Sequence, residues 1–97
     1  MYMNKEMIIQ QLQKIKPALQ EKYGVTELAL FGSYSRDEQT DTSDIDIMVS
    51  YTKKLGLEFL DMVYELDDLF DKEVQVVSKD GIKPKYFQAI KEDLIYV

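Results

Sequence analysis

The stretch DIDIMVSY, from Asp44 to Tyr51, constrains the fold more than any other part of the sequence. Successive side chains of a β-strand point to opposite faces, so the alternating pattern predicts a strand with one apolar face, made by Ile45, Ile47 and Val49. That face needs a cover of helices. The other face carries Asp44, Asp46 and Met48. Because two neighbouring carboxylates disfavour each other and resist burial, this face predicts a compensating cation or contact with water.

Helices are predicted where apolar residues recur at steps of three and four. Residues 5–23 carry such a stripe, and Gly24 is a natural stop for this helix. Pro17 should kink it or restart it near Lys16. A second helix is predicted within residues 55–70, and a third begins at Pro84. The apolar positions of the second helix are Phe59, Leu60, Val63, Leu66, Leu69 and Phe70.

Strands are predicted at residues 25–31, 44–51 and 73–78, with a short fourth strand at 94–97. The order helix, strand, strand, helix, strand, helix, strand indicates an α/β or α+β fold. We expect a small mixed sheet of three or four strands covered by about three helices. A chain of 97 residues predicts one domain, residues 1–97.

Composition excludes several classes of site. The chain has no cysteine and no histidine, so disulfides, thiol nucleophiles and imidazole bases are excluded, and any metal must be a hard cation held by oxygen. The net charge of −6 argues against direct binding of nucleic acid. No segment is predicted to be a signal peptide or a membrane span, and the lack of cysteine fits the cytoplasm.

One constellation carries chemistry: Gly32-Ser33, ten further residues, then Asp44-x-Asp46. Gly32 leaves room for a phosphate near the backbone. Ser33 offers a hydroxyl and an N–H, and a helical turn after Ser33 would add further N–H donors. The two aspartates can hold a divalent cation, with Mg²⁺ as the expected ion. The alternative is an ordinary polar connection whose aspartates face water.

The segment LALFGSYSRDEQTDTSDIDIMVSY resembles the signature of the minimal nucleotidyltransferases, small members of the polymerase-β-type nucleotidyltransferase superfamily. The resemblance covers nearly the whole chain. It implies a palm-like fold and transfer of a nucleoside monophosphate from a nucleoside triphosphate, expected to be ATP, to a hydroxyl. Many members are antitoxins encoded beside a HEPN-type toxin, and some nucleotidylate that toxin. A HEPN-type partner is therefore expected, and a homo-oligomer stays open.

By the same resemblance, Gly32 and Ser33 would hold the triphosphate, while Asp44 and Asp46 would act in catalysis by ligating Mg²⁺. Arg36 stands at the family's loop arginine and would contact phosphates; the alternative is a solvated surface arginine. Asp37 follows at a position where the family often has glycine, and its carboxylate would repel a phosphate.

A larger departure lies at Gln75, where the family usually has a third catalytic carboxylate. Glutamine cannot act as a base, and loss of a general base typically costs about 10²–10⁴ in rate. Glu73 lies on the same strand face, but two residues displace it by roughly 6–7 Å. Two functions stay open: transfer of a nucleotide to a partner protein, or a catalytically degenerate, nucleotide-binding antitoxin that acts by forming a complex.

The second predicted helix is also strongly acidic. Residues 58–71 contain six carboxylates and neither lysine nor arginine. Such a surface is either simply solvated or a docking surface for a basic partner, because complementary charge steers association.

Overall fold

The structure is a computed structural model that describes residues 3–97. Its elements follow the predicted order along the chain. They are α1 (Lys5–Tyr23), β1 (Val25–Phe31), β2 (Ile45–Tyr51), α2 (Glu58–Phe70), β3 (Val74–Ser78), α3 (Pro84–Ile90), the short 3₁₀ helix η1 (Lys91–Asp93) and β4 (Ile95–Tyr96). The predicted α/β class, with three α-helices, is confirmed.

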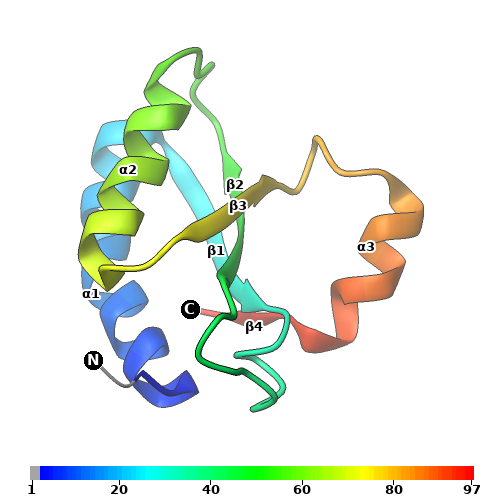
Figure 1. The fold of residues 1–97 in the computed structure, drawn as a ribbon. Helices are drawn as coiled ribbons and strands as arrows, with labels where there is room; N and C mark the ends of the chain where they lie inside the picture. The colour runs from blue at the N-terminus through cyan, green and yellow to red at the C-terminus, as the bar shows by residue number, and fades with distance from the viewer. Residues whose placement is uncertain (1–2) are drawn as a thin grey trace.

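The four strands form one mixed sheet in the order β3-β2-β1-β4. β1 runs antiparallel to both β2 and β4, whereas β2 and β3 are parallel. Parallel neighbours need a crossover connection, and α2 supplies it. Figure 1 shows α1 and α2 together on one side of the sheet and α3 on the other.

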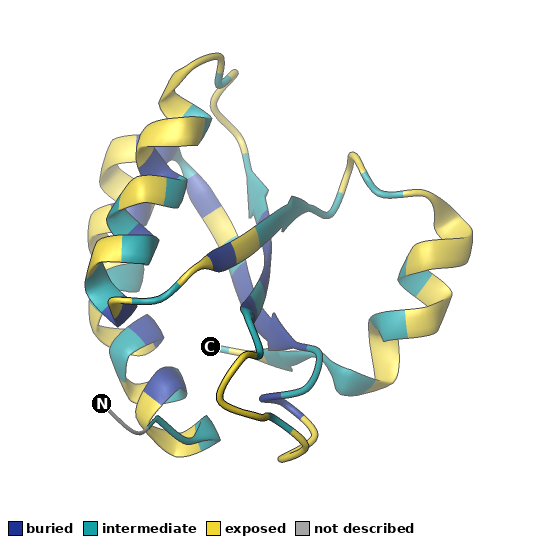
Figure 2. Cartoon of the chain, viewed as in Figure 1, coloured by how far each residue is buried: buried dark blue, intermediate teal, exposed yellow. Residues whose placement is uncertain are grey.

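The apolar face of β2 lies in the main core. Its three aliphatic side chains are fully buried and pack with buried residues of α1 and α2, such as Leu12 and Leu66. A second, smaller core lies on the opposite face, where Ala29, Phe31 and Met48 pack against α3. Buried residues therefore follow the strands and the inner sides of α1 and α2 (Figure 2). The face that carries Asp46 is polar only at one end.

Helix α1 has the ends that its sequence predicts. The side chain of Asn4 accepts a hydrogen bond from the Met7 N–H at 2.9 Å, and Gly24 closes the helix in the left-handed conformation. The predicted restart near Lys16 is wrong, because one helix continues through Pro17. Pro17 and Gln13, whose carbonyl loses its helical donor, are both exposed, so water can satisfy that carbonyl.

The apolar stripe of helix α2 is largely the predicted one, since Leu66 and Phe70 are buried and Phe59 and Leu69 pack against the main core, but it differs at two positions. Met62, Leu66 and Phe70 lie four residues apart and are buried, whereas Leu60 is 47% exposed. A helix presents one face to the core, and Leu60 lies outside the face set by these three residues. Among residues 3–97, no helix combines the length and the apolar character needed to cross a membrane.

Candidate functional site

The sheet register brings the predicted site residues to one end of β1, β2 and β3. Asp46 on β2 lies opposite Phe31, the last residue of β1, and opposite Gln75 on β3. Gly32 follows Phe31 directly, and Asp44 stands just before β2 begins at Ile45. Residues more than forty positions apart in the sequence thus converge because β2 is the central partner of both neighbouring strands.

Gly32 is in close contact with Asp46. Its φ angle is +79°, a left-handed conformation that side chains disfavour. An added Cβ would lie 2.1 Å from Asp46 Oδ2, far inside van der Waals contact. The space that the missing side chain leaves is therefore occupied by a carboxylate, which refines the expectation that this space serves a phosphate.

A helical turn follows Gly32. The Ser33 carbonyl accepts hydrogen bonds from the N–H groups of Arg36, at 3.2 Å, and Glu38, at 2.9 Å. The first N–H groups of such a turn, beginning with Ser33, lack partners within it and point out of its N-terminal end. They are suited to binding anionic oxygen.

Asp37 ends this turn with a φ angle of +58°. Glycine adopts this left-handed conformation more readily than other residues, which explains why glycine suits the position. The Asp37 carboxylate accepts a hydrogen bond from Lys5 Nζ at 3.1 Å. Its charge therefore has a partner on α1.

Arg36 is held by two carboxylates. Its Nε donates to Glu38 at 2.7 Å, and its Nη1 donates to Asp93 at 2.7 Å. These hydrogen bonds raise the pKa of Arg36. Asp93 belongs to η1, 57 positions away, and its carbonyl also accepts a hydrogen bond from the Ser35 hydroxyl. A phosphate at Arg36 would have to compete with both carboxylates.

Asp93 could not be predicted from the sequence, because no local spacing links it to the turn. The fold brings η1 beside the turn at residues 33–38, and this places Asp93 against Arg36 and Ser35. Asp93 therefore holds the side chain of Arg36, one of the candidate site residues.

The electrostatics of Asp46 favour a bound cation. Partial burial raises the pKa of the Asp46 carboxyl, the neighbouring Asp44 raises it further, and the Arg36 charge partly offsets both. Each raising cause disfavours the ionised carboxylate. A cation between Asp44 and Asp46 would remove this penalty.

The position of the third carboxylate is filled by an amide. Gln75 is exposed on β3, and its Nε2 donates to Asp44 Oδ2 at 3.3 Å. Glu73 lies outside β3 and is exposed. Residues 3–97 contain no group of three acidic, histidine or cysteine side chains arranged to hold a metal ion. Two carboxylates nevertheless suit Mg²⁺, which proteins often bind through one or two carboxylates together with substrate phosphates.

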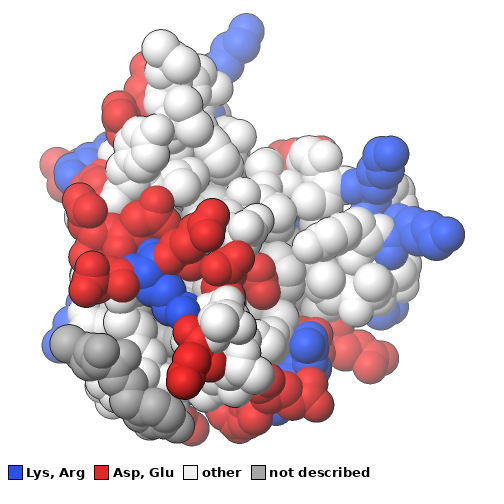
Figure 3. Space-filling view, viewed as in Figure 1, with Lys and Arg blue, Asp and Glu red and all other residues white. Residues whose placement is uncertain are grey.

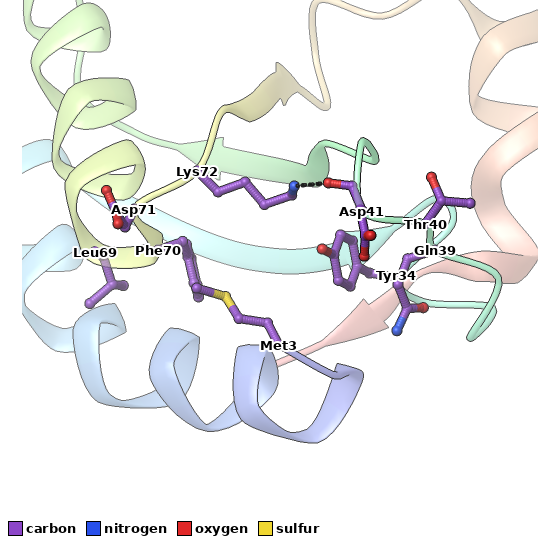
Figure 4. A pocket seen from close by; sticks show the side chains of 9 residues that line it. All are labelled: Met3, Tyr34, Gln39, Thr40, Asp41, Leu69, Phe70, Asp71 and Lys72. Carbon is purple, nitrogen blue, oxygen red and sulfur yellow. Dashed lines mark hydrogen bonds between the residues drawn. The ribbon is translucent and has the colours of Figure 1, made fainter. Parts of the chain in front are cut away.

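A separate pocket of about 400 Å³ lies between the start of α1, the β1–β2 loop and the end of α2 (Figure 4). Lys72 Nζ donates to the Asp41 carbonyl across it at 3.3 Å. Oε1 of Gln39, another lining residue, is buried without a hydrogen-bond partner among the described residues. None of the predicted site residues lines this pocket.

The chain is similar to known proteins over most of its length. The nucleotidyltransferase domain family matches residues 12–97. The chain is 43% identical over 88 residues to an inferred protein adenylyltransferase of Methanocaldococcus jannaschii, covering 89% of this chain and 90% of that protein. It is 32% identical over 83 residues to the protein adenylyltransferase MntA of Thermococcus cleftensis, covering 84% of each.

Solved structures share the fold. An inferred minimal nucleotidyltransferase has a TM-score of 0.80 at 23% identity, covering 97% of this chain and 96% of that one. A toxin–antitoxin structure with AMP-PNP has a TM-score of 0.64 at 26% identity, and the match covers 89% of this chain and 65% of that one. The structure of a tri-AMPylated Shewanella oneidensis HEPN toxin in complex with MNT antitoxin has a TM-score of 0.61 at 23% identity. The match covers 96% of this chain and 67% of that one.

The family match spans both the glycine-serine turn and the aspartate strand, and relatives above 30% identity cover most of the chain. The resemblance seen in the sequence is thereby confirmed, and the chain belongs to the nucleotidyltransferase domain family as a nucleotidyltransferase.

Proposed function

We propose that this protein transfers AMP from ATP, with Mg²⁺, to a hydroxyl group of a partner protein, and that the partner is a HEPN-type toxin. The observation that carries the proposal is the contact of Gly32 with Asp46, beside Asp44 and the turn at Ser33. The adenylyltransferase relatives support the reaction. The toxin–antitoxin structures support the nucleotide and the partner. A chain without cysteine is consistent with action in the cytoplasm.

In this proposal each residue has a distinct task. The N–H groups at the start of the Ser33 turn hold phosphate oxygens, and Gly32 lets the Asp46 carboxylate lie directly beside that turn. Asp44 and Asp46 would hold Mg²⁺, which when bound polarises the α-phosphate and neutralises the leaving pyrophosphate. Gln75 donates a hydrogen bond that orients Asp44. No carboxylate at position 75 is present to take the proton of the acceptor hydroxyl, so transfer by this chain is slow.

A second function is favoured by Gln75 itself. An amide that donates to Asp44 preserves the positions of the two aspartates while removing the base. A protein of this kind can still bind nucleotide and neutralise a toxin by forming a complex. Activity separates the two functions, because binding is common to both.

The test uses labelled ATP, Mg²⁺ or Mn²⁺ and the purified HEPN-type protein encoded by a neighbouring reading frame. We expect slow labelling of the partner by the native chain. Gln75→Asp restores the missing base and should raise the rate about 10²-fold or more. The matched control Gln75→Asn retains an amide and should give no such increase.

Two outcomes would contradict the proposed transfer. If Asp44→Asn and Asp46→Asn variants label the partner as fast as the native chain, the reaction does not use this site. If neither the native chain nor Gln75→Asp labels the partner, yet the toxin is still inhibited, the protein acts by complex formation.

A further inference from the structure

The outer face of α2 exposes large apolar side chains. Leu57 is 79% exposed, Leu60 47% and Tyr64 60%. Leu57 stands at the N-cap position of the helix, and the three residues are spaced at i, i+3 and i+7, which places them on one face. Single exposed apolar residues are ordinary, but a contiguous exposed patch is typical of an interaction site. We call these three residues, with Asp61 and Asp68, the α2 outer face.

Acidic residues flank the apolar ones on this face, with Asp61 in the first turn of the helix and Asp68 near its C-terminal end. Asp61 and Asp68 are exposed and lie at i+4 and i+11 from Leu57. Figure 3 shows mainly uncharged surface over the N-terminal half of α2 and acidic side chains gathered toward its C-terminal end.

Other carboxylates of α2 serve the fold. Glu65 accepts hydrogen bonds from Lys22, at 2.6 Å, and from the Tyr23 hydroxyl. Asp67 accepts one from the Val74 N–H at 2.8 Å. These contacts hold α2 against α1 and β3. Because Asp61 and Asp68 instead point to solvent beside the apolar residues, they are available to a partner.

We infer that the α2 outer face docks a partner protein through an amphipathic helix whose apolar residues are flanked by lysine or arginine. A helix with apolar residues at matching spacing would cover Leu57, Leu60 and Tyr64. Basic flanking residues would complement Asp61 and Asp68 and speed the encounter with a chain of net charge −6.

Charge also argues against other occupants. A symmetric dimer through this face would bring the aspartates of two identical, acidic chains together. An anionic membrane surface would repel the same carboxylates. A basic partner helix satisfies both the apolar and the acidic part of the surface.

The docking surface is separate from the nucleotide site. Helix α2 packs on the face of β2 that carries Ile45, Ile47 and Val49, opposite the face that carries Asp46. A partner bound at α2 therefore leaves the site open. The inference rests on the proposed function in that it adds a docking surface to it. Peptide binding needs neither nucleotide nor metal, so the docking inference and the proposed transfer can each fail while the other holds.

The test is a titration followed by NMR of the backbone amides. The probe is a designed amphipathic peptide of about 18 residues, long enough to lie along α2, with leucines on one face and lysines beside them. A second peptide keeps the leucines and replaces each lysine with glutamate. We expect the lysine peptide to shift amide signals of residues 57–68, and the glutamate peptide to bind at least about tenfold more weakly.

Variants locate the contact. Leu60→Ser and Tyr64→Ser should each lower the affinity for the lysine peptide about tenfold. Tyr86 is 45% exposed on α3, so Tyr86→Ser is the matched control and should leave binding unchanged. All three side chains are exposed, so each variant should keep the native circular dichroism spectrum.

Three results would overturn the inference. Equal affinity for the two peptides would show that charge has no part in recognition. Shifts centred on Asp46 and Gln75 would place the peptide elsewhere. Sedimentation that shows a native dimer, dissociated by Leu60→Ser, would make a second copy of the chain the occupant.

Discussion

At Gly32 two independent features exclude a side chain. The backbone is left-handed, and a Cβ would collide with Asp46 Oδ2. Because Asp46 is also fixed by strand pairing to Phe31 and Gln75, it cannot move away without disturbing the sheet. One residue of the β1–β2 loop therefore determines where a carboxylate of the candidate site lies.

Gly32→Ala should reduce nucleotide transfer about 10²-fold or more, because displacement of a reacting group by about 1 Å can cost that much. Single-turnover assays with labelled ATP would measure the loss. Gly81→Ala is the matched control, since a Cβ there would meet its nearest neighbours at 3.7 Å. Equal activity of both variants would show that the position of Asp46 is not critical.

At the scale of elements, α1 and α2 are joined by a polar contact at the edge of the main core. The Tyr23 hydroxyl donates to Glu65, which also binds Lys22. Burial, the hydrogen bond to Glu65 and the nearby negative charges raise the pKa of Tyr23 to about 12. The phenol is therefore easier to ionise in the unfolded chain, where its pKa is about 10.

This difference predicts a loss of stability at high pH. Between pH 10 and 12 the unfolded chain loses the Tyr23 proton while the folded chain keeps it, so the free energy of unfolding falls by up to about 3 kcal/mol. Urea unfolding at a series of pH values would measure the fall. Tyr23→Phe should lack this contribution, whereas Tyr86→Phe, at an exposed position, should retain it. Identical pH profiles for all three proteins would contradict the assignment.

At the scale of the whole molecule, the two faces of the sheet are covered unequally. The face toward α1 and α2 contains most of the buried residues, whereas α3 has none. Partly buried Phe87 and Ile90 hold α3 on the second core, and Lys79 lies over the Phe87 ring at 5.9 Å from its centre. Few buried apolar contacts mean a low free energy of local opening.

We therefore expect the amides of α3 to exchange with solvent faster than those of β1 and β2 under native conditions. Phe87→Ala should speed exchange in α3 and in η1 while leaving the central strands protected, because the main core lies on the other face. Hydrogen exchange followed by mass spectrometry would resolve the segments. Uniform protection across the chain would show that α3 opens only with global unfolding.

Much of the fold could be predicted from local spacing. The alternation in Asp44–Tyr51 set the two faces of β2, and steps of three and four marked α1. Such patterns depend only on the periods of strand and helix, so they can be read from neighbouring residues. The glycine-serine and Asp-x-Asp spacing likewise indicates the candidate site.

The tertiary structure decided what depends on distant residues. The sheet register placed Gln75 against Asp44, and the packing of α3 placed Asp93 against Arg36. The burial of Met62 left Leu60 exposed, and the solvent around Pro17 let α1 continue. Local spacing fixes the face on which a side chain lies, but only the packing of elements decides which side chain it meets. For this reason the sequence by itself indicated the residues of the candidate site, while the contacts that position them were determined by the fold.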